Sequence, residues 1–109
     1  MSKRLFVGSD FHCGHLVRLT HPDYQIPWNA AIRGKYGIVQ RELWNFFVEE
    51  VTVGGTYDGG LFVGDLIEGS GARSGGSELI TTDRVEQCEI ATKCIEAIPF
   101  KEGAKKYIQ

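Results

Sequence analysis

The stretch LFVGSDFHCGH (residues 5–15) carries a short apolar run directly into an acid, two histidines and a cysteine. The apolar run, within residues 3–9, stops at Gly8, which is typical of a short strand buried in a parallel sheet. Polar side chains that follow such a strand lie at its carboxyl end, where open α/β sheets bind their ligands. The stretch therefore predicts a first strand and, directly behind it, a candidate site that includes Asp10 and His12.

Strand and helix patterns alternate along the rest of the chain. Residues 36–51 place an apolar side chain at every third or fourth position, as an amphipathic helix does. A glycine-bearing turn, residues 54–60, leads into a second apolar run at residues 61–63. Asp83 and Glu86 resemble a capping box that opens a second helix, and residues 106–109 are expected to begin a third strand. This β-α-β-α-β order predicts an α/β fold with a parallel half-sheet and right-handed crossovers.

The apolar stripes of the two helices predict the faces that they bury. In the first helix the stripe consists of Tyr36, Val39, Leu43, Phe46, Phe47 and Val51, and in the second of Val85, Cys88, Ala91, Ile95 and Ile98. Cys88 and Cys94 are expected to be small core residues. The third cysteine, Cys13, completes an odd number without a CxxC pair, so neither a disulfide framework nor a structural zinc knuckle is favoured.

Length and composition describe an ordinary globular chain. The 109 residues predict one domain, residues 1–109, and the 42% hydrophobic and 24% charged residues with a net charge of −2 are typical of a folded protein. This charge gives no support for generic attraction to nucleic acid or to a membrane. The apolar run near the N-terminus is too short for a signal-peptide core or a spanning helix, so a cytoplasmic location is expected.

Two carboxylates and an imidazole are expected to meet at one edge of the predicted sheet. Asp10 and His12 follow the first strand, and Asp65 follows the second. Carboxylate and imidazole together form a common ligand set for manganese, iron or zinc. The alternative is structural: Asp10 caps a turn, His12 is a satisfied, partly buried histidine, and Gly64-Asp65 is a plain turn.

These residues form two motifs with a family resemblance. Asp10-Phe11-His12 and Gly64-Asp65-Leu66-Ile67-Glu68 resemble the Asp-x-His and Gly-Asp-x-x-Asp motifs of the calcineurin-like metallophosphoesterases, with glutamate in the last position. The longer form that ends at His15 is similar to phage and prophage members. The resemblance implies that Asp10 and His12 bind one metal ion and that Asp65 bridges two. It also implies that Glu68 orients a ligand or a catalytic histidine.

The resemblance also implies a reaction, which is metal-dependent hydrolysis of a phosphoester. The expected substrate is a phosphodiester such as a nucleotide or nucleic acid. The expected cofactors are two divalent ions, with Mn²⁺ first and iron, zinc or nickel as alternatives. His15 is expected to contact the substrate phosphate or supply a proton, with a solvated loop histidine as the alternative.

The resemblance covers the N-terminal half of the family's αββα sandwich. Its later motifs, Gly-Asn-His and two further histidine motifs, are absent, since no histidine follows His21. We therefore expect an incomplete domain, inactive alone, whose bare sheet face promotes self-association or pairing with a missing C-terminal half. Two other hypotheses stay open. One is a short, non-catalytic interaction module with a partial metal site, and the other is an unrelated small α/β domain with accidental motif matches.

Overall fold

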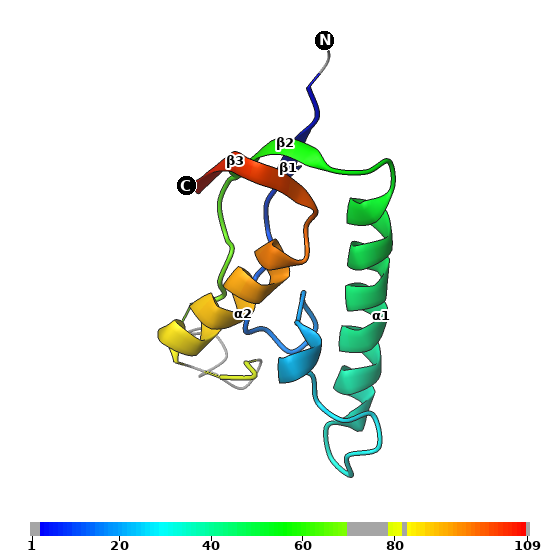
Figure 1. The fold of residues 1–109 in the computed structure, drawn as a ribbon. Helices are drawn as coiled ribbons and strands as arrows, with labels where there is room; N and C mark the ends of the chain where they lie inside the picture. Colours follow the sequence, from blue (N-terminus) through cyan, green and yellow to red (C-terminus); the bar gives the residue numbers. More distant parts are fainter. Residues whose placement is uncertain (1–2, 70–78, 82, 109) are drawn as a thin grey trace.

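A three-stranded parallel sheet and two long helices form the protein in a computed structural model, which describes residues 3–69, 79–81 and 83–108 (Figure 1). The elements are β1 (Leu5–Gly8), the short 3₁₀ helix η1 (Pro22–Tyr24), α1 (Gly34–Thr52), β2 (Tyr57–Phe62), α2 (Arg84–Glu96) and β3 (Phe100–Ile108). The strand order is β1-β2-β3 with both pairings parallel, so β2 is the central strand. This confirms the α/β class and the parallel sheet that the alternation of patterns predicts.

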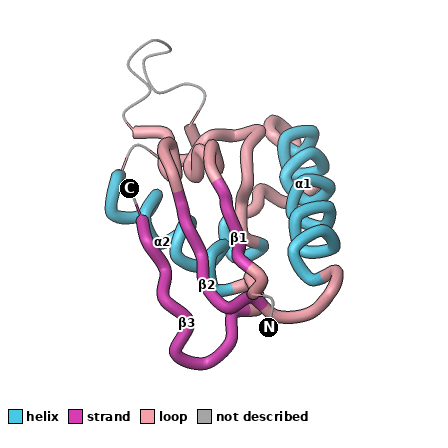
Figure 2. Tube along the Cα trace, turned by 90° about the horizontal axis from the view of Figure 1, so that it is seen from above, coloured by secondary structure: helices cyan, strands magenta, loops and turns pink. Residues whose placement is uncertain are grey.

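Both helices lie on the same face of the sheet (Figures 1 and 2), as two right-handed crossovers in one direction require. Phe62 on β2 and Ile90 on α2 are fully buried between these layers, with Phe6 of β1 against the Phe62 ring. The opposite face is open. Leu5, Val7, Leu61 and Tyr107, each at least 42% exposed, line a groove of about 590 Å³ across it.

The central strand begins earlier than the sequence suggests. Residues 57–60, predicted as part of a turn, belong to β2, which runs from Tyr57. Gly60 is required there because a Cβ at this position would lie 2.7 Å from the Phe100 ring. β3 likewise begins at Phe100, not near residue 106, and it contains Gly103 at a φ of +75°.

The buried helix faces differ from the predicted stripes. On α2 the buried residues are Gln87, Ile90, Ala91 and Cys94, whereas Val85 and Cys88 are exposed. On α1 they are Gly34, Gly37, Gln40 and Val51, and the predicted Val39, Leu43 and Phe46 are exposed to between 37% and 64%. Val51, Ala91, Ile98 and Cys94 are buried as predicted, but each helix also buries a glutamine that the predicted stripe omits. The prediction that Cys88 is a core residue is wrong.

The side chains of the buried glutamines form hydrogen bonds with loop backbone. Gln40 donates to the carbonyl of Leu16 at 2.8 Å and accepts from the N–H of Ile26 at 2.8 Å. Gln40 thereby gives hydrogen-bond partners to the backbone of two loop residues, Leu16 and Ile26. Among the described residues no helix is long and apolar enough to cross a bilayer.

Candidate metal centre

The loops that follow β1 and β2 run alongside each other beyond the ends of the strands. The N–H of Asp10 donates to the carbonyl of Gly64 at 3.3 Å, and the N–H of His12 donates to the carbonyl of Asp65 at 2.8 Å. The N–H of Cys13 then donates to the carbonyl of Leu66 at 2.9 Å, and the carbonyl of Cys13 accepts from the N–H of Glu68 at 3.1 Å. This ladder of four bonds extends the parallel pairing and fixes one loop against the other.

Asp10, His12 and Asp65 meet at this ladder. One ligand atom from each side chain lies within 4.8 Å of the other two. Asp10 and Asp65 are exposed and His12 is partly buried, so the cluster opens to solvent. The structure thus brings together the three residues that the sequence assigns to a metal ion.

All three residues have a left-handed backbone. Their φ angles are +60° for Asp10, +47° for His12 and +50° for Asp65, and no other non-glycine residue in the described ranges has a positive φ. Aspartate and histidine tolerate this region better than most residues, but it remains sparsely populated. Strain of this kind gathers at functional sites, where the surrounding structure holds it in place.

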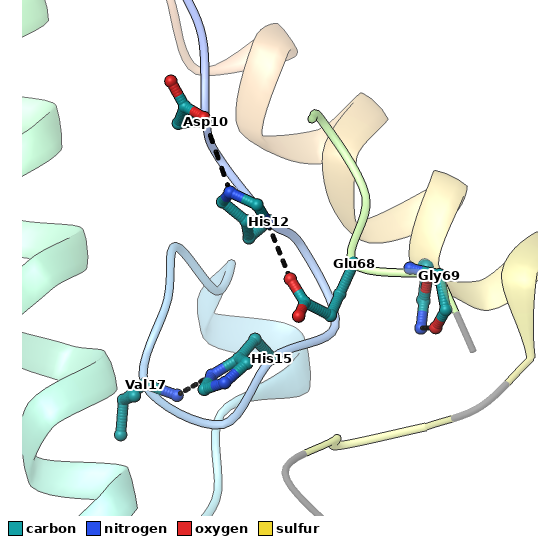
Figure 3. Close-up of polar contacts among 7 residues, drawn as sticks. Asp10, His12, His15, Val17, Glu68 and Gly69 are labelled. Carbon is teal, nitrogen blue, oxygen red and sulfur yellow. Dashed lines mark hydrogen bonds and ion pairs between the residues drawn. The ribbon is translucent and has the colours of Figure 1, made fainter. Parts of the chain in front are cut away.

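Glu68 contacts Nδ1 of His12, the ring nitrogen on the side away from Asp10. Its Oε2 lies 2.7 Å from Nδ1 of His12, while Nε2 of the same ring lies 3.5 Å from Oδ1 of Asp10 (Figure 3). With Glu68 as the acceptor, the ring proton is on Nδ1 and the lone pair of Nε2 faces the cluster. A carboxylate behind a histidine is the usual partner of a metal-binding imidazole.

A buried amide supports the loop that carries Glu68. Gln87 of α2 donates to the carbonyls of Gly69 and Thr81 at 2.8 and 2.9 Å and accepts from the N–H of Gly69 at 2.8 Å. Gly14 leaves room for it, since a Cβ there would lie 2.6 Å from the Gln87 side chain. Gln87 is not among the residues predicted from the sequence; its only signal there is its spacing, three and four residues before Ile90 and Ala91.

His15 lies outside the cluster of three. Its Nδ1 accepts from the N–H of Val17 at 3.1 Å, and its ring is turned toward Val17 (Figure 3). His15 is nonetheless on the same loop as His12, whose carbonyl accepts from the His15 N–H at 3.1 Å. The proton-donating role of His15 stays a prediction.

Cys13, next to His12, belongs to the core. It is fully buried, and its thiol hydrogen-bonds that of Cys94, which together with burial raises the pKa of Cys94. The Cys13 side chain is therefore enclosed in the core, and it is not among the side chains that meet at the cluster. The donor set of the site is therefore two carboxylates and one imidazole.

This donor set fits a divalent cation such as Mn²⁺, iron or zinc. The oriented Nε2 of His12 and the exposed carboxylate oxygens of Asp10 and Asp65 are the atoms that would hold the ion. No protein-family model, curated protein or solved structure matches the chain, so the site is interpreted from its own geometry.

Proposed function

We propose that this chain carries the first metal-binding half of a metal-dependent phosphoesterase, in which Asp10, His12 and Asp65 bind a divalent cation. The observation that supports the proposal is the convergence of these side chains at the carboxyl ends of two adjacent parallel strands, with Glu68 on the far nitrogen of His12. The same four residues make up the Asp-x-His and Gly-Asp-x-x-Glu motifs that resemble the calcineurin-like metallophosphoesterases.

Each of the four residues has its own role in the proposed site. Asp10 and His12 would bind the cation from the first loop and Asp65 from the second. Bridging of two ions by Asp65 is the role that the family resemblance implies. Glu68 keeps His12 in one tautomer and one ring orientation. A bound cation supplies polarisation of the phosphoryl oxygens and a more acidic water, which is the chemistry that phosphoester hydrolysis needs.

The number of metal ligands determines which activity is expected of the chain alone. Three ligands are enough for one ion, whereas a two-ion site needs further ligands that the cluster does not contain. In this proposal Mn²⁺ binds to the chain, and hydrolysis belongs to an assembly that completes the site and the αββα sandwich. The interior of the cell is the expected setting.

The test is a Mn²⁺ titration of the purified chain, of Asp65→Asn and of Asp83→Asn, with bis-p-nitrophenyl phosphate hydrolysis measured in parallel. Asparagine tolerates the positive φ of Asp65, so the fold is expected to persist while Mn²⁺ affinity falls at least about tenfold. Asp83 caps α2 outside the cluster, and asparagine caps equally well, so this control keeps the affinity. Equal Mn²⁺ binding by the unsubstituted chain and Asp65→Asn would refute the proposal.

A second candidate, a non-catalytic interaction module, is favoured by the open sheet face. Leu5 and Val7 are each 65% exposed there, in a row that a monomer rarely leaves bare. This candidate predicts a stable oligomer without turnover. Because the module can retain the partial metal site, the two candidates differ not in Mn²⁺ binding but in whether an assembly that contains the chain hydrolyses a phosphodiester.

A further inference from the structure

Two grooves flank the candidate metal centre, and each contains one of its carboxylates. The first, the α2 groove, has a volume of about 430 Å³ and is lined by Asp65, Ile67, Cys88, Thr92, Ile95 and Ile108, among others. The second, the α1 groove, has a volume of about 570 Å³ and is lined by Asp10, Arg18, Leu19, Leu43, Phe46 and Phe47, among others. Asp10 and Asp65 have ligand atoms within 4.8 Å of each other, so each groove borders a residue of the cluster.

The size and chemistry of the grooves suit organic groups. Each volume falls within the roughly 300–1,000 Å³ of ordinary small-molecule pockets. The walls are mostly apolar: Ile95 and Ile67 in the α2 groove, Phe46 and Leu43 in the α1 groove. Burial of apolar or aromatic groups is the interaction that such walls offer.

A monoester has one organic group and would fill one groove, whereas a diester has two. A phosphoryl group at the cluster would direct the two ester groups of a diester to opposite sides, one into each groove. We infer that the substrate is a small phosphodiester with an apolar or aromatic group on each ester oxygen, one bound in the α2 groove and one in the α1 groove. This inference rests on the proposed function, since the cluster must first hold the phosphoryl group.

The charges argue against a long nucleic acid. No lysine or arginine is among the described residues that line the α2 groove, and Arg18 is the one cation in the α1 groove, where Glu50 offsets it. A polynucleotide needs a series of cations along its phosphates. The grooves therefore fit a compact diester better than an extended polyanion.

The test uses three inert diesters of equal charge, namely dimethyl, methyl phenyl and diphenyl phosphate, in calorimetric titrations of the chain saturated with Mn²⁺. Each added ring is expected to tighten binding about tenfold, because it buries apolar surface in one groove. A (dT)₆ oligonucleotide serves as the comparison. Equal affinity for the three diesters, or tighter binding of the oligonucleotide than of diphenyl phosphate, overturns the inference.

Two groove-filling variants locate the rings. Thr92→Trp fills the α2 groove and Leu43→Trp the α1 groove, with Glu96→Trp and Val39→Trp, on exposed helix positions that line neither groove, as matched controls. Each groove-filling variant is expected to weaken diphenyl phosphate binding about tenfold without changing dimethyl phosphate or Mn²⁺ affinity. If only one groove-filling variant has this effect, the substrate occupies one groove and the diester inference is wrong.

The Mn²⁺ titration distinguishes failure of the proposed function from failure of the diester inference. Mn²⁺ binding that needs Asp65, together with no preference among the three diesters, overturns the groove inference and leaves the proposed function standing. Failure of the chain to bind Mn²⁺ refutes the proposed function itself and, with it, the inference.

Discussion

Glu68 and His12, fifty-six residues apart in the chain, are joined by a contact of 2.7 Å between a carboxylate oxygen and Nδ1. Each lies in one of the two loops that the backbone ladder fixes together, and the side chains of both are only 23–24% exposed. This contact predicts different effects for two substitutions at Glu68. Glu68→Gln can still accept from the His12 ring through its amide oxygen, whereas Glu68→Ala cannot.

Mn²⁺ affinity is therefore expected to fall about 10- to 100-fold in Glu68→Ala and less in Glu68→Gln. Equilibrium dialysis with ⁵⁴Mn measures both. Glu49→Ala, on the exposed side of α1, is the control and should bind as the unsubstituted chain does. If Glu68→Ala binds Mn²⁺ normally, Glu68 has no orienting role.

The left-handed backbone at Asp10 gives a second prediction, on stability. Asp10→Gly is expected to be more stable than Asp10→Ala by about 1 kcal/mol, because alanine is strained at a φ of +60° and glycine is not. At Glu49, inside α1, the order should reverse, since glycine weakens a helix by about 1 kcal/mol relative to alanine. Urea unfolding of the four variants without metal decides the matter. The same order at both positions would mean that the backbone at Asp10 is relaxed.

A third prediction concerns Gln87. Gln87→Leu keeps the size of the side chain but leaves the N–H of Gly69 and the carbonyls of Gly69 and Thr81 without their partner. The free energy of unfolding should fall by about 2–3 kcal/mol, and Mn²⁺ affinity should fall with it because Gly69 follows Glu68. Glu96→Leu, exposed at the end of α2, should change neither quantity. Stability lost without any loss of affinity would show that Gln87 does not support the site.

The fourth prediction is a pH dependence carried by Asp58. The backbone N–H of Arg4, at 2.7 Å, and then the Lys101 ammonium, at 2.9 Å, hold the pKa of this carboxyl below its ordinary value of 3.8. The folded state therefore binds this proton less readily than the unfolded state. The resulting stability is present above about pH 4 and is lost as the pH falls further.

Asp58→Asn removes that contribution. Between about pH 5 and pH 2 the variant should lose less stability than the unsubstituted chain, as measured by urea unfolding at each pH. High salt should narrow the difference, since Lys101 is exposed and its attraction is screened. Parallel pH curves for the two proteins would assign the acid sensitivity to other groups.

The open sheet face gives a fifth prediction. The chain is expected to self-associate with rising concentration, and Leu5→Lys with Val7→Lys is expected to shift it toward monomer, because these side chains are exposed on β1. Sedimentation velocity measures the shift. Ile32→Lys is the control, since Ile32 is 88% exposed in the loop before α1. A monomer at all concentrations would mean that the exposed face does not drive association.

The sequence predicts the convergence of Asp10, His12 and Asp65 better than it predicts the buried faces of the helices. Parallel strands deliver the residues that follow them to one edge of the sheet, so Asp10, His12 and Asp65 could be placed together from their positions alone. Prediction of the buried face of a helix requires instead knowledge of which side chains the core encloses. Gln40 and Gln87 have polar side chains, and only the tertiary structure shows that loop backbone satisfies them.

The backbone at the site also could not be predicted. The left-handed angles at the three cluster residues follow from the ladder between the loops, which needs both strands in register. Likewise Gly59 and Gly60 suggest a turn by composition, but close packing against Lys105 and the Phe100 ring makes them part of the central strand. In each case contacts distant in sequence override the local preference.

The ladder between the two loops has a consequence for ion selectivity. Because four backbone hydrogen bonds tie the Asp10 loop to the Asp65 loop, the backbones that carry the two carboxylates cannot move apart without breaking them. Ca²⁺ needs longer bonds, about 2.3–2.6 Å, and more oxygen ligands than the smaller Mg²⁺, which binds at about 2.0–2.1 Å. If the proposed site binds a cation, this fixed backbone spacing should favour a smaller ion over calcium.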